Sequence, residues 1–306
     1  MKPRVLPAAL LGLVLTAVVP ATAAAAPQPS PAQAYWESDD ELVYSGGWGK
    51  ANQVTITNYG SASFLIDDVT RIVPGAGCVN VAGDNTRAIC TDTDPSLGWF
   101  AVHLNDGDDT LDYRASFNSY ATLHGGSGDD TILIETGAGA YVAVTGDAGA
   151  DTLMRTGGNA YVVVEGGTGA DTMCGTDVYV TYKSHTQGVT ASIGGAVYGD
   201  GAPGEGDTVC PSVRSITGTP YADTLSVAGS TGPTSLSGGA GNDTLTGNAV
   251  RDSLWGGPGN DVLTGNGGDD HLVGEDGVDT LNGGAGTADE CRADGVDTLY
   301  FCEDVF

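Results

Sequence analysis

The chain has few basic side chains, with 11 lysines and arginines against 39 aspartates and glutamates in 306 residues. Its formal net charge is −28 at pH 7. Nucleic acids and anionic membrane surfaces bind basic patches, so this balance argues against both as partners. Hydrophobic residues still make up 40% of the chain, which is too many for a disordered acidic tail. The composition predicts a folded protein whose acids are neutralised by cations.

Residues typical of active sites are also scarce. The four histidines are widely separated, and none lies in a zinc or catalytic-triad motif. The glycine-rich strings do not link a strand to a helix, so they are not phosphate-binding loops. Adjacent aspartates would suit a glycosidase or a polysaccharide lyase, but the chain has few bases to hold an acidic polymer. We therefore expect a protein that is not an enzyme.

Long apolar runs are confined to the N-terminus. Lys2 and Arg4 precede an apolar run at 5–19 and an alanine-rich stretch that ends at Ala26, which is typical of a signal peptide at 1–26. Its removal takes two bases and no acid, leaving 11 − 2 = 9 bases against 39 acids. The C-terminal region has no apolar span of the roughly 20 residues that a membrane helix needs. We expect free secretion, no membrane span and an extracellular partner whose identity the sequence leaves open.

The chain has six cysteines, and in an exported protein these favour disulfides. Six cysteines allow 15 connectivities, and joining neighbours along the chain is the simplest of them. Metal binding by the cysteines is less favoured, because no C-x-x-C spacing occurs. The expected pairs are Cys78–Cys90, Cys174–Cys210 and Cys291–Cys302.

Residues 238–300 divide without gaps into nine-residue units, of which the first reads GGAGNDTLT. Position six is an aspartate and position eight a leucine, except in the sixth unit, where Ala288 takes position six. Upstream, 218–226 has the same form with Asp223, and 229–237 keeps the phase with Thr234 in place of the aspartate. The array therefore begins near residue 218. Its aspartates after that point are Asp243, Asp252, Asp261, Asp270, Asp279 and Asp297.

A longer period precedes this array. Its markers are four Asp-Thr pairs at steps of 21, 21 and 20 residues, each with an aromatic residue ten positions earlier that opens a strand-like run. One coil per 20 or 21 residues predicts a β-solenoid, in which each coil contacts only its neighbours. The aromatic row could form a stacked ladder or an exposed platform for sugars, and we favour the ladder. The aspartates are Asp109, Asp130, Asp151 and Asp171, and the aromatic residues are Trp99, Tyr120, Tyr141 and Tyr161.

Glycine and aspartate at these positions indicate a hard cation. Glycine permits positive φ and lets turn carbonyls approach one another, while aspartate supplies an anionic oxygen. Several hard oxygens held by a flexible turn suit Ca²⁺, which takes six to eight ligands, better than Mg²⁺ or Zn²⁺. The alternative is that each aspartate only caps its own turn. Rows of stacked carboxylates repel without cations, which favours calcium.

The units GGAGNDTLT and GGPGNDVLT resemble the hemolysin-type, or RTX, calcium-binding nonapeptide repeat. The resemblance is close over 218–300 and looser over 99–173. It implies a right-handed parallel β-roll in which two nonapeptides make one coil and calcium lies between stacked turns. Turns 18 residues apart then share an edge. On the first edge it implies carboxylate ligands from Asp243, Asp261, Asp279 and Asp297, with turn ligands at Gly238, Ala240, Gly256, Pro258, Gly274 and Asp276.

The resemblance implies fewer calcium sites elsewhere. The second edge carries Asp252 and Asp270, but Arg251 and Ala288 lie in or beside ligand positions there. We expect one weak site near Asp270 at most on that edge. The Asp223 turn begins the array, and up to three further sites are expected in the earlier coils. Those would use Asp109, Asp130, Asp151 and Asp171.

Together these patterns predict an all-β chain, a parallel β-solenoid or right-handed β-roll with N-terminal cap coils. We expect a secreted calcium-ion-binding protein whose metal binding is coupled to folding. The alternatives are a calcium-stiffened adhesin or polysaccharide-binding scaffold and, less favoured, a polysaccharide-degrading enzyme. The expected segments are a signal peptide (1–26), a linker (27–40), a cap with the first coils (41–98), a solenoid of 20–21-residue coils (99–174), an irregular strand with an inserted acidic loop (175–217), and an RTX-like nonapeptide roll with a C-terminal cap (218–306).

Overall fold

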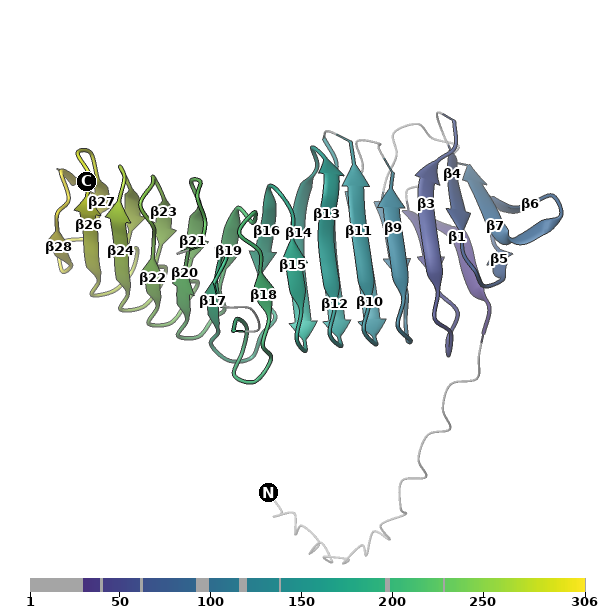
Figure 1. Cartoon of the computed structure of the whole chain (residues 1–306), viewed down its shortest axis with the longest axis horizontal. Coiled ribbons are helices and arrows are strands. Elements are labelled where there is room, and N and C mark those ends of the chain that lie inside the picture. Colours follow the sequence, from purple (N-terminus) through teal and green to yellow (C-terminus); the bar gives the residue numbers. More distant parts are fainter. Residues whose placement is uncertain are drawn as a thin grey trace, which may run out of the picture.

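The computed structural model describes residues 30–38, 41–60, 63–91, 99–115, 120–137, 139–195, 199–227 and 229–305. Within these ranges every regular element is a β-strand, and the strands form coils stacked along one long axis (Figure 1). This confirms the expected all-β parallel solenoid. The described residues hold no helix that could span a membrane. The expected signal peptide at 1–26 lies outside them.

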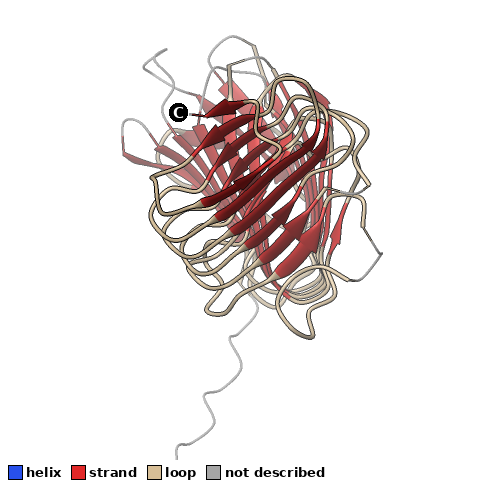
Figure 2. Ribbon diagram, turned by 90° about the vertical axis from the view of Figure 1, so that its left-hand side faces the viewer, coloured by secondary structure: helices blue, strands red, loops and turns tan. Residues whose placement is uncertain are grey.

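The strands form three sheets that wrap around a common interior (Figure 2). The long sheet has 14 strands and runs the length of the molecule. Its order is β29 (Asp304–Val305), β27 (Glu290–Arg292), β25 (His271–Val273), β23 (Ser253–Trp255), β21 (Ser235–Ser237), β19 (Ser215–Thr217), β16 (Val178–Thr181), β14 (Tyr161–Thr168), β12 (Tyr141–Ala148), β10 (Tyr120–Ser127), β8 (Trp99–His103), β2 (Glu41–Ser45), β1 (Ala32–Ser38) and β5 (Ile72–Pro74).

The second face of the solenoid is divided between two sheets. The N-terminal sheet has nine strands and the C-terminal sheet has six. The order of the N-terminal sheet is β18 (Thr208–Val209), β15 (Thr172–Cys174), β13 (Thr152–Gly158), β11 (Thr131–Thr136), β9 (Thr110–Arg114), β3 (Gln53–Asn58), β4 (Ser63–Asp67), β7 (Asp84–Thr91) and β6 (Cys78–Val81). The order of the C-terminal sheet is β17 (Thr190–Ser192), β20 (Thr224–Ser226), β22 (Thr244–Thr246), β24 (Val262–Gly267), β26 (Thr280–Ala285) and β28 (Thr298–Tyr300).

Parallel pairing places equivalent residues of successive coils side by side. In the C-terminal sheet, for example, Leu245 lies opposite Leu263, and Leu263 lies opposite Leu281. The leucines at position eight are fully buried from Leu225 to Leu281, and Leu299 in the last unit is partly buried, so each short strand contributes one side chain to a continuous core. Burial of one such side chain contributes about 1.5–3 kcal/mol. The period of the sequence therefore sets the strand register.

The N-terminal end is closed by antiparallel strands. β1 pairs with β2, β4 pairs with β3 and β7, and β6 pairs with β7. The expected linker at 27–40 was wrong for 32–38, which form β1. Ala32 and Ala34 of this strand are fully buried, and these small side chains let it pack closely over the first coils.

The segment 175–217 is also more regular than the expected insertion. β16 continues the long sheet, β18 ends the N-terminal sheet and β17 begins the C-terminal sheet. The acidic stretch of the segment, at 199–207, forms a loop whose ends are joined by a bridge between Asp200 and Asp207. The segment is thus the joint at which one coil period gives way to the other.

Disulfides join the three cysteine pairs named above. Cys78–Cys90 links β6 to β7 in the cap, Cys174–Cys210 links β15 to the residue after β18, and Cys291–Cys302 links β27 to the last turn. The described residues contain no free cysteine. These covalent links lie at the cap, at the joint and at the C-terminal end.

The exposed aromatic residues form a stacked ladder across the long sheet. The ring centroids of Trp99 and Tyr120 lie 5.0 Å apart, and those of Tyr141 and Tyr161 lie 5.5 Å apart. Tyr179 on β16 extends the row, with its ring centroid 4.2 Å from that of Tyr161. Tyr120 and Tyr141 join the two stacked pairs, with ring centroids 5.7 Å apart and planes tilted by 45°, so all four predicted residues belong to one ladder.

Candidate metal centre

Turn aspartates of successive coils form hydrogen-bonded ladders. In each ladder, the backbone N–H of one aspartate donates to Oδ1 of the aspartate one coil later. The distance is 2.8 Å from Asp109 to Asp130 and also 2.8 Å from Asp243 to Asp261. This arrangement fixes one oxygen of every carboxylate and leaves Oδ2 for another partner.

Three ladders are present in the described residues. The N-terminal ladder leads into the N-terminal sheet, the C-terminal ladder leads into the C-terminal sheet, and the opposite-edge ladder leads into the long sheet. Their members are Asp109, Asp130, Asp151, Asp171 and Asp207; Asp223, Asp243, Asp261, Asp279 and Asp297; and Asp252, Asp270 and Asp289.

Two members of these ladders, Asp289 and Asp207, were not predicted from the sequence. Asp289 takes the ladder position that strict nine-residue counting gave to Ala288, since its Oδ1 accepts the N–H of Asp270 at 2.8 Å. The turn has one extra residue, and Cys291 then lies buried opposite Leu272 in the register. The sequence signal that was available is the apolar Cys291 two positions after Asp289, the distance at which leucine follows the aspartate in the other units.

The other missed residue is Asp207, which ends the N-terminal ladder. Its Oδ1 accepts the N–H of Asp171 at 3.0 Å across the 36 residues that separate them. Burial raises its pKa to about 7. The pair Asp207-Thr208 has the same form as the pairs that open the earlier turns, but the irregular spacing concealed it.

The second carboxylate oxygen distinguishes two kinds of turn. Of the twelve aspartates that close a six- or seven-residue turn, nine have a buried Oδ2 with no hydrogen-bond partner. In all nine turns the residue at position two has positive φ, for example Gly239 at 113° and Glu275 at 73°. The nine are Asp109, Asp130, Asp151, Asp171, Asp243, Asp261, Asp270, Asp279 and Asp289.

In the remaining three turns, position two lacks positive φ and Oδ2 accepts a backbone N–H. Thr219 donates to Asp223 at 2.6 Å and Asn248 donates to Asp252 at 2.8 Å. In the last turn, Asp294 at position three donates to Asp297 at 3.0 Å. Positive φ turns the N–H of position two away from the carboxylate. The conformation of this residue thus decides whether the turn satisfies its own aspartate.

In eight of these nine turns, glycine at position one keeps a space open beside the free oxygen, and only the Asp109 turn has Leu104 there. A Cβ placed on Gly125 would lie 2.5 Å from Oδ2 of Asp130 and 2.7 Å from the carbonyl oxygen of Gly146 in the next coil. A Cβ on Gly256 would meet Asp261 Oδ2 and lie 2.8 Å from the Gly274 carbonyl oxygen. The space is therefore lined by a carboxylate of one coil and a carbonyl of the next.

Burial of these carboxylates disfavours their charged form. Burial, together with neighbouring aspartates, raises the pKa of Asp243 to about 7 and that of Asp151 to about 8. Burial likewise raises the pKa of Asp261 and of Asp270 to about 6. A buried carboxylate without a donor is costly unless it takes up a proton or a cation. The donor set, carboxylate and backbone oxygens, is what Ca²⁺ prefers.

The expected turn ligands lie along the same edge. Carbonyl oxygens of Gly256 and Gly274 accept N–H groups of the preceding coil at 3.1 Å, and those of Pro258 and Asp276 do so at 2.9 and 2.8 Å. Each carbonyl has a second lone pair. Gly238 and Ala240 hold the equivalent places in the first turn of this series. No group of three or more His, Cys, Asp or Glu side chains suited to a metal occurs in the described residues, so backbone oxygens would have to complete each site.

Comparison with protein families identifies the repeat. The model of the RTX calcium-binding nonapeptide repeat matches four copies in this chain, at residues 122–139, 217–254, 228–263 and 255–287. The chain carries RTX calcium-binding repeats. RTX nonapeptide repeats bind Ca²⁺, and the free oxygens and open spaces described above fit that ion. A comparison with curated proteins finds no match.

The matched residues include both kinds of coil. Three RTX matches lie in the nonapeptide array, and the match at 122–139 contains the turn of Asp130 in the longer coils. The opposite-edge ladder also belongs to the RTX array, and Asp270 and Asp289 have the same free oxygen as the aspartates of the first edge. The two edges of the array therefore differ less in turn geometry than their residue types predicted.

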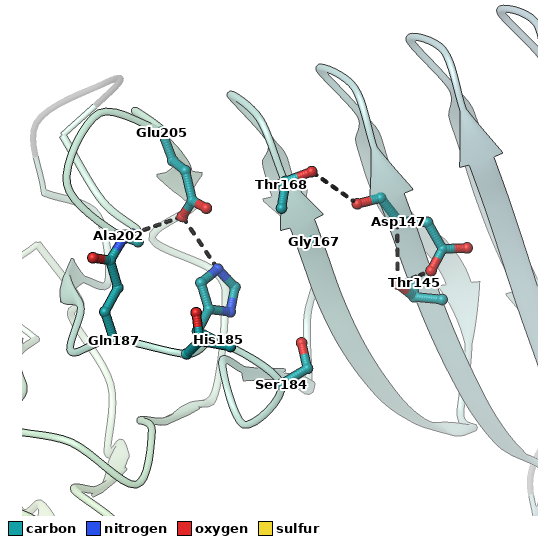
Figure 3. A pocket seen from close by; sticks show the side chains of 10 residues that line it. Thr145, Asp147, Gly167, Thr168, Ser184, His185, Gln187, Ala202 and Glu205 are labelled. Atoms are coloured by element: carbon teal, nitrogen blue, oxygen red, sulfur yellow. Dashed lines mark hydrogen bonds and ion pairs between the residues drawn. The ribbon is translucent and has the colours of Figure 1, made fainter. Parts of the chain in front are cut away.

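A polar cavity of about 330 Å³ lies beside the N-terminal ladder, between β12, β14 and the acidic loop (Figure 3). Its His185 side chain is only 6% exposed and places Nε2 3.1 Å from Oε2 of Glu205. The same oxygen accepts the N–H of Ala202 at 2.7 Å. No described group lies within hydrogen-bond distance of His185 Nδ1. The pair joins the acidic loop to the segment after β16. It was not predicted, because 20 residues separate the partners and no repeat relates them.

Proposed function

We propose that the protein is secreted, binds Ca²⁺ between stacked RTX turns and couples that binding to folding. The observation that carries the proposal is the set of nine buried Oδ2 atoms without a donor, each in a turn whose position two has positive φ. Bound Ca²⁺ would supply the positive charge and oxygen coordination that these groups lack. The apolar leader at 1–26 and the three disulfides support an extracellular location.

Different atoms and residues of each turn have different roles in such a site. Oδ1 of each aspartate fixes the spacing of two coils, the free Oδ2 of nine of them presents a charge to the space between the coils, and glycine at position one keeps that space open in eight of these nine turns. The buried leucines hold the turns in register. Without a cation the stacked carboxylates repel one another, which opposes closure of the coils. We propose no catalytic role for these residues.

The direct test is a calorimetric titration of the protein, stripped with EDTA, with Ca²⁺, followed by circular dichroism on the same samples. We expect saturable binding of several ions, at most one for each free Oδ2, with a gain of β-sheet signal. Mg²⁺ at the same concentration is the control and should bind more weakly, because it demands a rigid octahedral site. Absence of binding at millimolar Ca²⁺ would show that the aspartates only cap their turns.

A further inference from the structure

At its end on β16, the aromatic ladder has a ring face that no other described ring covers. Tyr120, Tyr141 and Tyr161 each lie between two neighbouring rings, which are stacked except for the Tyr120–Tyr141 pair, tilted at 45°, so a ligand ring has little room against their faces. Tyr179 stacks on Tyr161 alone among the described rings. The next strand, β19, places Ser215 opposite Tyr179 in the register. The row of large rings therefore ends in a step down to small hydroxyl side chains.

This step forms a groove of about 560 Å³ across β12, β14, β16, β19 and β21, here called the Tyr179 groove. Tyr161 and Tyr179 form one wall, and the floor carries the hydroxyl side chains of Ser215, Thr217 and Ser235. The volume is within the range of small-molecule sites, about 300–1,000 Å³. An aromatic face beside several hydroxyl groups matches the two surfaces of a pyranose ring, one apolar and one polar.

The groove also contains a lysine that forms no ion pair. Lys183 lines it, and none of the ion pairs in the described ranges includes this residue. The nearby carboxylate of Glu165 accepts the backbone N–H of Ser184 at 2.9 Å instead. An unpaired ammonium group in a chain with a net charge of −28 would attract one carboxylate locally, while the rest of the surface would repel a long anionic polymer.

We propose that the Tyr179 groove binds a short glycan whose pyranose ring carries a carboxylate, such as a sialic or uronic acid. The free face of Tyr179 stacks on the ring, Ser215 and Ser235 hydrogen-bond its hydroxyls, and Lys183 pairs with the carboxylate. This function is separate from calcium binding, because the groove lies on the outer face of the long sheet and shares no residue with the aspartate ladders. The glycan is thus a second ligand of the solenoid, in addition to calcium.

The test measures binding of sialyllactose and of a glucuronate-containing disaccharide to the whole protein at saturating Ca²⁺, by calorimetry or ligand-observed NMR. Lactose and the methyl ester of sialyllactose are the uncharged controls. We expect at least one acidic sugar to bind, and its uncharged counterpart to bind roughly tenfold more weakly. The two acidic probes distinguish a sialic acid from a uronic acid. Failure of both to bind at millimolar concentration overturns the proposal.

Three variants locate the site. Tyr179→Ala should weaken binding of the acidic sugar roughly tenfold, a typical loss for a stacked ring. Lys183→Gln should remove the preference for the acid over the uncharged sugar. Tyr120→Ala is the matched control, because this tyrosine is exposed in the same ladder but lies between the rings of Trp99 and Tyr141 and outside the groove. Equal losses in Tyr120→Ala and Tyr179→Ala would overturn the proposal, and an unchanged calcium titration in each variant separates this result from calcium binding.

Discussion

The coils at 99–174 and those at 218–300 use the same aspartate ladder but differ in how much else stabilises them. The N-terminal strands β10, β12 and β14 have eight residues each, whereas β22, β23 and β25 have three. The coil that contains β10 and β11 buries Ala121, Leu123, Ile132 and Ile134, but the coil of β22 and β23 buries only Leu245 and Leu254 on its strands. Each extra buried aliphatic side chain contributes about 1.5–3 kcal/mol.

The two regions also differ in their outer surfaces and edges, and here too the N-terminal coils have the additional stabilising contacts. The N-terminal coils carry the stacked aromatic ladder, and on their second edge the buried guanidinium of Arg155 donates to the carbonyl oxygens of Gly158 and Thr176. The C-terminal coils have aspartate ladders on both edges. A positively charged side chain of the protein thus lies at one edge of the N-terminal coils, whereas the C-terminal coils have rows of negative side chains on both edges. We therefore expect folding of the C-terminal coils to depend on calcium more than folding of the N-terminal coils of the same solenoid.

Removal of calcium should give the largest difference between the two regions. In excess EDTA we expect the C-terminal coils to lose their hydrogen-exchange protection while the N-terminal coils keep most of theirs, because only the latter have a substantial apolar core. Exchange measured by mass spectrometry on peptides from 120–174 and 236–290 tests this. Mg²⁺ added back in place of Ca²⁺ is the control. Equal loss of protection in both regions would refute this difference in calcium dependence.

A single methyl group at position one should disable one calcium site of the C-terminal coils. Gly256→Ala places a Cβ against Asp261 Oδ2 and 2.8 Å from the Gly274 carbonyl oxygen. We expect one ion fewer in the titration and a loss of about 1–3 kcal/mol of stability. Gly232→Ala is the control, because a Cβ there meets nothing within 4 Å. An unchanged ion count in Gly256→Ala would mean that this space holds no metal.

The stability of the calcium-free protein should decrease as pH rises. The folded-state pKa values of Asp151 (about 8) and Asp243 (about 7) lie above the value near 3.9 of an unfolded chain. Between pH 4 and pH 8 the folded state therefore binds more protons than the unfolded state, so the free energy of unfolding falls with increasing pH. Urea titrations in EDTA at pH 5 and pH 8 test the sign. At saturating Ca²⁺ the dependence should weaken or reverse, because protons and calcium compete for the same oxygens.

Repetition explains how much of this could be predicted from the sequence. Parallel coils repeat one register, so the spacing of Asp243, Asp261 and Asp279 was enough to predict the strands, the buried leucines and the stacked turns. Where the period changed, the prediction failed. Asp289 lies after one extra residue, and Asp207 lies beyond a loop whose length no repeat fixes. The strand at 32–38 was missed because its partners are antiparallel cap strands outside any repeat.

Backbone conformation was the other property that residue types did not reveal. The identity of position two is a poor guide, since Asn266 and Glu275 adopt positive φ while Asn248 does not. In the Asn248 turn the side-chain Nδ2 donates to the carbonyl oxygens of Val227 and Ser230, which belong to the previous coil. Tertiary contacts thus select the turn conformation, and with it the number of free carboxylate oxygens.

The smallest expected effect follows from that contact and would make the two edges of the C-terminal coils more alike. Asn248→Gly removes the bonds from Nδ2 and permits positive φ, so the N–H that now donates to Asp252 Oδ2 can turn away. Asn248→Ala removes the same bonds but disfavours positive φ, which makes it the matched control. We expect the glycine variant to bind one more calcium ion than the alanine variant, with weak affinity because Arg251 lies beside the site. Equal ion counts in the two variants would show that position two does not control metal binding, and that the buried oxygens of the other nine turns owe their free state to something else.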